Sequence, residues 1–455
     1  MTETRQHTLP VCTVSHTITP TTPTELAVMH PSRIILAKRR ARVVARTKKL
    51  SAFLDVLALI DELDENDASP AVKKRSALLA RKRVPWATYI KSMLGDGTFK
   101  GRFRMGHDDF MVLVDLVRED IERDTRMGEL CNGAIPVEYQ VAMTLRWLAG
   151  ASIYEGMDGD VITRSTAYAT AHRVIDALNA CSALACKWPV GDEVAREARL
   201  FKERSSWDVI DKAFGAMHGL FIRLIEPNFH EHAATHAFFS GHKKAFGMNF
   251  QGICNANYQI IAWTMNCPGS QNDCTAFKFS GFPKLLKDVP PGYYILGDAA
   301  YPASDRVLVP FPGTALSASQ DAFNFFQSQC RISIEQTFGI MVRRWGILWK
   351  SIEVRLERFN AVVNAVVRCH NFCRSRVIDV PTDNVEITVP AGVQFDDQGR
   401  ISNDFFRSAR PGGRRVADQA SISAPREAIR QRLEVEGIVR PRYNIARNQS
   451  RLAGR

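Results

Sequence analysis

The stretch that decides the fold runs from residue 293 to residue 345, and it opens with YYILGDAAYP at residues 293–302. The apolar run before Gly297 is typical of a buried strand. Pro302 cannot extend that strand, because proline has no backbone N–H to donate. Asp298 is therefore predicted to lie in the turn that directly follows a strand.

The same stretch closes with CRISIEQTFGIMVRRW at residues 330–345. Its apolar residues recur at helical spacing and predict one packed stripe: Ile334, Phe338, Met341, Val342 and Trp345. Glu335 lies beside that stripe, with Arg331 one turn earlier. A carboxylate at a strand end and a second on a later helix suit two acidic ligands that converge on a metal ion.

Further segments repeat the order of motifs found in one family. They are residues 214–219, 268–273, 297–302, 324–325, 331–339 and 369–372. Together they resemble the nuclease domain of PIF/Harbinger-type DNA transposases, and of the nuclear proteins descended from them, over roughly residues 99 to 376. The resemblance implies an RNase H-like fold, a DNA substrate, a nuclear location and a separate Myb-like DNA-binding partner protein.

The resemblance also implies a DDE triad that holds Mg²⁺ or Mn²⁺. Asp298 and Glu335 match its second and third members. The first member departs from the family, because His218 stands where the family carries aspartate. An imidazole offers one neutral nitrogen and cannot bridge two metal ions as a carboxylate does, so metal affinity is expected to fall, most severely for Mg²⁺.

A nearby carboxylate could replace the missing one. Neither Asp211 nor Glu226 is a credible replacement. Asp211 lies an odd number of residues from His218, so on a regular strand it faces the other side, and Glu226 lies about 26 Å from His218 along an extended strand. Asp273 is better placed, as an auxiliary metal ligand near the catalytic end of the sheet. The alternative for Asp273 is a structural carboxylate at a helix N-terminus.

Periodicity independently predicts an α/β core. Strands are expected at residues 213–225, 244–255, 258–265 and 293–296, with a short helix near Asp273 and a long one bearing Glu335. Another apolar helix is expected at 359–377. This is the order of an RNase H-like fold, a mixed sheet flanked by helices.

The domain plan follows from composition and charge. Residues 1–95 are expected to be a mostly disordered basic arm, 96–200 a helical module, 205–377 the nuclease domain, and 378–455 a mostly disordered basic tail with one short helix near 425–436. The helical module allows a helix-turn-helix interpretation. Its DNA-reading helix would carry Arg164, Tyr168, His172 and Arg173, and the alternative is a three-helix bundle that reads no DNA.

The net charge of +12 and pI near 9.3 favour an anionic partner, with nucleic acid the simplest choice. Lys38, Arg39 and Arg40 begin a basic cluster that continues to Lys49, and a second cluster spans residues 73–83. Such clusters indicate nuclear import or DNA contact, or else a solvated helix face. The ten cysteines form no zinc or disulfide pattern, which favours a reducing intracellular location. Neither a signal peptide nor a membrane span is expected.

Four histidines follow the first predicted strand: His230, His232, His236 and His242. Their density could bind Zn²⁺, although the spacing matches no established ligand pattern and the segment also fits an inserted polar loop. Two functions therefore remain. One is a metal-dependent DNA endonuclease impaired at His218, and the other is a non-catalytic nuclear DNA-binding or protein-interaction protein derived from a transposase.

Overall fold

The computed structural model describes residues 85–122, 134–153, 162–377 and 423–441. The predicted basic clusters at residues 38–49 and 73–83 lie outside these residues. No helix among the described residues is long and apolar enough to span a membrane.

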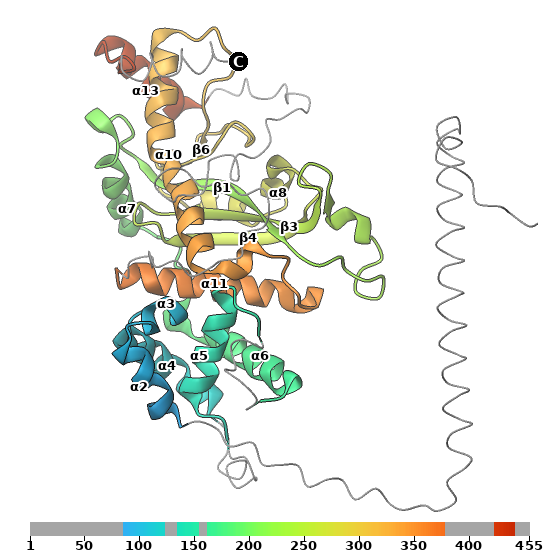
Figure 1. The fold of residues 1–455 in the computed structure, drawn as a ribbon. Helices are drawn as coiled ribbons and strands as arrows, with labels where there is room; N and C mark the ends of the chain where they lie inside the picture. The colour runs from blue at the N-terminus through green and yellow to red at the C-terminus, as the bar shows by residue number, and fades with distance from the viewer. Residues whose placement is uncertain (1–84, 123–133, 154–161, 378–422, 442–455) are drawn as a thin grey trace, which may run out of the picture. The chain divides into compact units, whose positions relative to one another are not determined.

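A mixed β-sheet forms the centre of the structure (Figure 1). Its strands are β1 (Ala213–Arg223), β2 (Phe239–Ser240), β3 (Ala245–Cys254), β4 (Ile260–Pro268), β5 (Tyr294–Leu296) and β6 (Val307–Leu308). β3 pairs antiparallel with β1, β2 and β4, whereas β5 pairs parallel with β1 and β6. Apart from the two-residue β2, three antiparallel strands (β1, β3 and β4) are followed along the chain by two parallel ones (β5 and β6), which confirms the predicted RNase H-like core.

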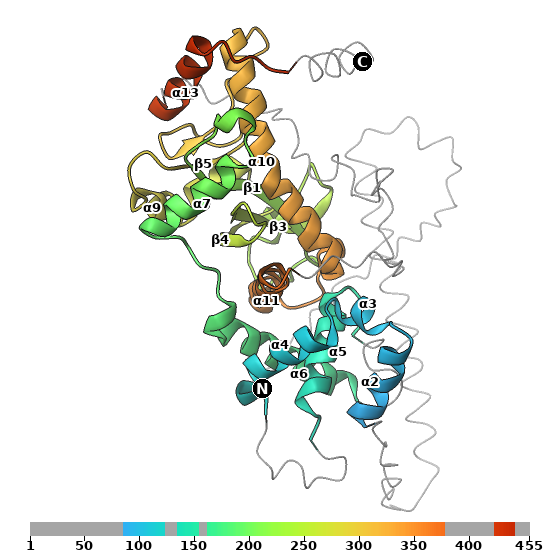
Figure 2. The same ribbon diagram turned by 90° about the vertical axis from the view of Figure 1, so that its left-hand side faces the viewer.

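Helices cover both faces of this sheet. One face packs against α10 (Ala318–Arg344) and α11 (Leu356–Ser375), and the other against α7 (Asp192–Lys202), α8 (Asp273–Lys278) and α9 (Phe282–Lys287). Figure 2 shows α10 running across the sheet. Its 27 residues begin at a capping box, in which the Ser317 side chain accepts from the Gln320 N–H and the Gln320 side chain accepts from the Ser317 N–H.

The N-terminal helices form a bundle that packs on α11. They are α2 (Trp86–Gly95), α3 (Phe99–Phe103), α4 (His107–Ile121), α5 (Val137–Leu148) and α6 (Arg164–Ala180). Short 3₁₀ helices lie at Ser182–Leu184, Ser206–Asp208, Thr235–Phe238 and Gly346–Trp349. The first described helix, α2, begins at Trp86, inside residues 1–95, the range predicted to be a mostly disordered arm. Trp86 stacks on Phe110 of α4 with 5.7 Å between ring centroids, and this contact holds α2 against the bundle.

The bundle and the sheet-containing core meet through two glycines. A Cβ on Gly150, whose φ is +105°, would lie 3.0 Å from the backbone of Gly346, and a Cβ on Gly346 would lie 2.5 Å from the Ala149 oxygen. Only residues without a side chain allow this approach. Arg104 and Arg344 reinforce it, since Arg104 donates to the Ala149 carbonyl and Arg344 to the Arg104 carbonyl.

The helix expected near residues 425–436 is present as α13 (Ala424–Val435). It packs on α10, and Ile429 and Leu433 are buried there. Arg426 stacks over the Phe311 ring at 4.4 Å, and Arg432 pairs with Asp211 at 3.2 Å. This part of the predicted tail is therefore folded against the sheet-containing core.

Candidate active site

The candidate site lies where two parallel strands separate. The β1–β5 ladder ends at the pair Ala216–Leu296, while β1 continues to Arg223. His218 lies two residues beyond Ala216 and Asp298 two residues beyond Leu296. Because the strands are parallel, this equal offset brings the two side chains together.

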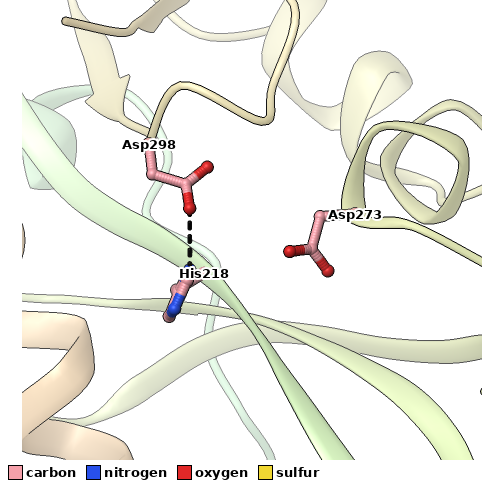
Figure 3. A group of neighbouring side chains, drawn as sticks. All are labelled: His218, Asp273 and Asp298. Atoms are coloured by element: carbon pink, nitrogen blue, oxygen red, sulfur yellow. Dashed lines mark ion pairs between the residues drawn. The ribbon is translucent and has the colours of Figure 1, made fainter. Parts of the chain in front are cut away.

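His218 and Asp298 are in contact, as Figure 3 shows. The distance from His218 Nδ1 to Asp298 Oδ2 is 3.4 Å, and the two side chains are 4% and 19% exposed. The His218 ring stacks against Phe338 of α10, with ring centroids 6.4 Å apart. A strand, a turn and a helix therefore fix the imidazole in place.

The two groups hold each other in the charged form. Burial lowers the pKa of His218, but the adjacent Asp298 carboxylate outweighs burial and leaves that pKa raised. Burial likewise raises the pKa of Asp298, yet His218, the Ala300 N–H and the Arg331 charge together leave it lowered. Each group therefore favours the charged form of the other.

Asp273 brings a second carboxylate to the same place. It is the first residue of α8, but Asn272 caps that helix by accepting from the Thr275 N–H. The Asp273 Oδ1 instead accepts from Asn249 Nδ2 at 3.0 Å and from Gln251 Nε2 at 2.9 Å. This bonding points to a role in the site, in addition to the structural role at a helix start.

Gly219 makes room for Asp273. A Cβ at this position would lie 2.2 Å from Asp273 Oδ1 and 2.8 Å from Gln251 Nε2. Any side chain there would push the carboxylate off the sheet. Position 219 therefore requires glycine for steric reasons.

His218, Asp273 and Asp298 form one compact set of donors. A ligand atom from each lies within 4.8 Å of the others, and this is the one such group found among the described residues (Figure 3). The predicted auxiliary residue Asp273 thus joins His218 and Asp298. The four histidines at 230–242 form no group of this kind; the His232 Nδ1, for example, accepts from the Ala234 N–H.

Comparison with known proteins agrees with this geometry. Residues 218–371 match the family described as DDE superfamily endonuclease, and the match begins at His218 itself. Residues 218–371 are thus similar to the DDE superfamily endonucleases. The chain is also 22% identical over 360 residues to "Protein ALP1-like" of Arabidopsis thaliana, a match that covers 74% of this chain and 82% of that protein. No solved structure shows a significant match.

The expected resemblance to a transposase-derived DDE family is therefore confirmed. Within the matching residues, Glu335 does not belong to the three-residue donor group. Its Oε1 accepts from Arg331 Nη1 at 2.6 Å, across one turn of α10. Arg331 also acts electrostatically on His218 and Asp298, so this turn of α10 faces the site. The convergence of the Asp298 and Glu335 carboxylates to within about 8 Å stays a prediction.

These residues do not fit the pair of hard metal ions that the family implies. Two such ions need bridging carboxylates, but the first position is an imidazole paired with Asp298. The third carboxylate is paired with Arg331. The remaining donor group has the size and number of ligands for one ion.

A second layer of residues positions Asp298. The buried Gln327 of α10 donates to the Gly297 carbonyl at 2.6 Å and to the Leu308 carbonyl at 3.1 Å. One turn earlier, Asn324 exchanges two hydrogen bonds with the backbone of Phe311. Both residues tie the turns after β5 and β6 to α10, and their role could not be assigned from the sequence.

The motif at residues 369–372 is structural. His370 bonds the Tyr258 carbonyl at 2.8 Å, and Asn371 bonds both the N–H and the carbonyl of Ile260. The amide side chain thereby anchors the first residue of β4 to α11. This motif supports the sheet and lies outside the donor group.

The predicted DNA-reading residues lie on α6. Thr163 caps this helix as expected, accepting from the Thr166 N–H. Arg173 donates to Gln140 of α5 at 2.8 Å, and Tyr168 stacks on His172. Tyr168 and His172 line a cavity of about 480 Å³ together with residues 353–355, 357 and 358. Residues 149–163 separate α5 from α6, and this connector is far longer than the tight turn of a helix-turn-helix motif. DNA contact by Arg164, Tyr168, His172 and Arg173 stays a prediction.

Proposed function

We propose that this protein is a transposase-derived DNA endonuclease whose activity is impaired at the first position of its triad. The observation that carries the proposal is the His218–Asp298 pair, placed where β1 and β5 separate in the segment that matches the DDE endonucleases. Asp298 and Glu335 remain as the two catalytic carboxylates. His218 occupies the first position without supplying a bridging oxygen.

The substrate is the DNA phosphodiester backbone, and any residual cleavage would depend on Mg²⁺ or Mn²⁺, although the first triad position supplies no bridging carboxylate. The net charge of +12 supports binding to a polyanion. Asp298 and Glu335 would hold the metal, with Asp273 as an auxiliary ligand. The basic clusters at residues 38–49 and 73–83 support a nuclear location and DNA contact. A Myb-like partner protein would then supply recognition of the target sequence.

A nicking assay on supercoiled DNA tests this proposal. The full chain should nick slowly with Mn²⁺ and stop when EDTA is added. Asp298→Asn and Glu335→Gln should each lower the rate at least tenfold. The control is Asp115→Asn, which removes a largely exposed carboxylate on α4 and should leave the rate unchanged. Nicking that survives Asp298→Asn would contradict the assignment.

The second candidate is a non-catalytic DNA-binding or protein-interaction protein. It draws support from the same geometry, because His218 neutralises Asp298 and Arg331 neutralises Glu335. This candidate predicts DNA binding without metal-dependent cleavage under any of these conditions. Measuring binding and nicking on one preparation separates the two candidates.

A further inference from the structure

The donor group has the dimensions of a site for a single cation. Zinc lies about 2.0–2.2 Å from nitrogen and oxygen ligands, so two donors at a tetrahedral angle are about 3.4 Å apart. His218 Nδ1 and Asp298 Oδ2 are 3.4 Å apart, and all three ligand atoms lie within 4.8 Å. A modest contraction around one ion would bring Asp273 into range.

Both carboxylates are already oriented by the protein. Asp298 Oδ1 accepts from the Ala300 N–H at 2.9 Å, and its Oδ2 faces His218. The Oδ1 of Asp273 accepts from two side-chain amides, and Figure 3 shows one oxygen of this carboxylate turned toward the other two residues. Hydrogen bonds of this kind fix metal ligands in their binding orientation.

This support extends into the core. Gln251, which donates to Asp273, in turn accepts from the Tyr301 hydroxyl at 2.5 Å. Gln251 and Tyr301 are almost completely buried. A connected, buried polar network that ends on one carboxylate, beside a glycine that makes room for it, is typical of a built site.

The donor types select the class of ion. One imidazole nitrogen with two carboxylate oxygens suits Zn²⁺ and similar transition metals, whereas Mg²⁺ demands near-octahedral oxygen coordination and retains several waters. His218 is only 3% exposed, so little room is left around it for the water ligands that Mg²⁺ retains. We propose that His218, Asp273 and Asp298 bind one Zn²⁺-class cation, and that His218 converts the site of a two-Mg²⁺ enzyme into a transition-metal site.

This proposal concerns binding alone, and it stands whether or not DNA is cleaved. The full chain, stripped with a chelator and dialysed, is titrated calorimetrically with Zn²⁺ and separately with Mg²⁺. Visible absorption on titration with Co²⁺ reports the ligand field directly. One equivalent of Zn²⁺ should bind at the site at least a hundredfold more tightly than Mg²⁺, and Co²⁺ should compete for it.

Variants assign the bound metal to these residues. Asp273→Asn, which keeps the side-chain size, should weaken Zn²⁺ binding at least tenfold, and His218→Ala should abolish the site. His218→Asp should reverse the preference toward Mg²⁺ and Mn²⁺. The control is the double variant His232→Ala/His236→Ala, which should retain full Zn²⁺ stoichiometry and affinity.

Two results would overturn the proposal. One is Zn²⁺ binding that is unchanged in both His218→Ala and Asp273→Asn, and the other is Mg²⁺ binding as tight as Zn²⁺. If His218→Ala fails to fold by circular dichroism, Asp273→Asn decides the outcome. DNA nicking is measured separately, so the nuclease proposal can fail while this one holds.

Discussion

Glu335 is held by Arg331, with 2.6 Å between Arg331 Nη1 and Glu335 Oε1 across one turn of α10. The residue that the family uses as a metal ligand is thus partnered by a cation from its own helix. The same guanidinium acts on His218 and Asp298. It therefore opposes the entry of a metal ion in two ways, by its charge and by occupying Glu335.

Removing this guanidinium should strengthen metal binding. Arg331→Gln is expected to raise the affinity for Mn²⁺ about fivefold, equivalent to about 1 kcal/mol, because one nearby positive charge is lost and Glu335 is released. Isothermal titration of the full chain measures the change. Arg343→Gln, three turns further along α10, serves as the control, and an equal gain in that variant would contradict a local effect.

Gln327 should position Asp298. Gln327→Leu leaves the Gly297 and Leu308 carbonyls without their donor, at a cost of about 2 kcal/mol in the free energy of unfolding. Asn324→Ala also removes two backbone bonds from α10, but at Phe311. Both variants should be less stable in urea. Only Gln327→Leu should lower the nicking rate about tenfold, and equal losses would indicate a purely structural role.

His370 should make the fold sensitive to acid. The pKa of His370 is lowered to about 3, chiefly by burial and also by the Arg344 and Arg374 charges, while the hydrogen bond to the Tyr258 carbonyl opposes the shift. In the unfolded chain this imidazole takes up a proton near pH 6.5, whereas in the folded chain it stays neutral. The unfolded state therefore binds more protons between pH 6.5 and about pH 3, and stability falls as pH falls, by about 1.4 kcal/mol per pH unit from this residue.

Urea unfolding between pH 7.5 and pH 5 measures this slope. His370→Gln keeps an N–H that can reach the Tyr258 carbonyl but cannot titrate, so the variant should show a shallower dependence on pH. His242→Gln changes an exposed histidine and should behave like the wild type. An unchanged slope in His370→Gln would contradict the assignment.

Much of the fold was predictable because it follows from local patterns. β1, β3, β4 and β5 lie close to their predicted bounds, since each strand is an apolar or alternating run. α10 begins at Ala318, well before the predicted stripe, and the missed signal was the Ser317–Gln320 capping box. α7 was also missed, although its buried Val194, Ala198 and Phe201 recur at helical spacing.

The site was predictable only in part. The side-by-side placement of His218 and Asp298 follows from the parallel register of β1 and β5, which no single strand encodes. Asp273 was a candidate from its position after a strand, but its bonds to Asn249 and Gln251 depend on the packing of α8 on β3. Arg331 was visible one turn from Glu335 in the sequence. Whether Glu335 pairs with Arg331 or binds a metal ion, however, is decided by the three-dimensional electrostatics of the site.

DNA binding should depend steeply on salt. The basic clusters at residues 38–49 and 73–83 are expected to neutralise several phosphates, each adding about 0.9 to the slope of log affinity against log salt. Fluorescence anisotropy with a DNA duplex compares the full chain with a variant lacking residues 1–84 and 442–455. A truncated protein with unchanged affinity and slope would show that the basic ends serve another purpose, such as nuclear import.

The central claim is that the histidine at position 218 limits the rate of DNA cleavage by this protein. The nicking of supercoiled DNA by His218→Asp tests this claim most directly. The variant restores bridging oxygens and a negative charge that hold two cations against their mutual repulsion. We expect its rate with Mg²⁺ or Mn²⁺ to exceed that of the wild type at least tenfold, and the double variant His218→Asp/Glu335→Ala to be inactive. A wild type that nicks well and a His218→Asp variant that does not would contradict the claim and make His218 a catalytic base.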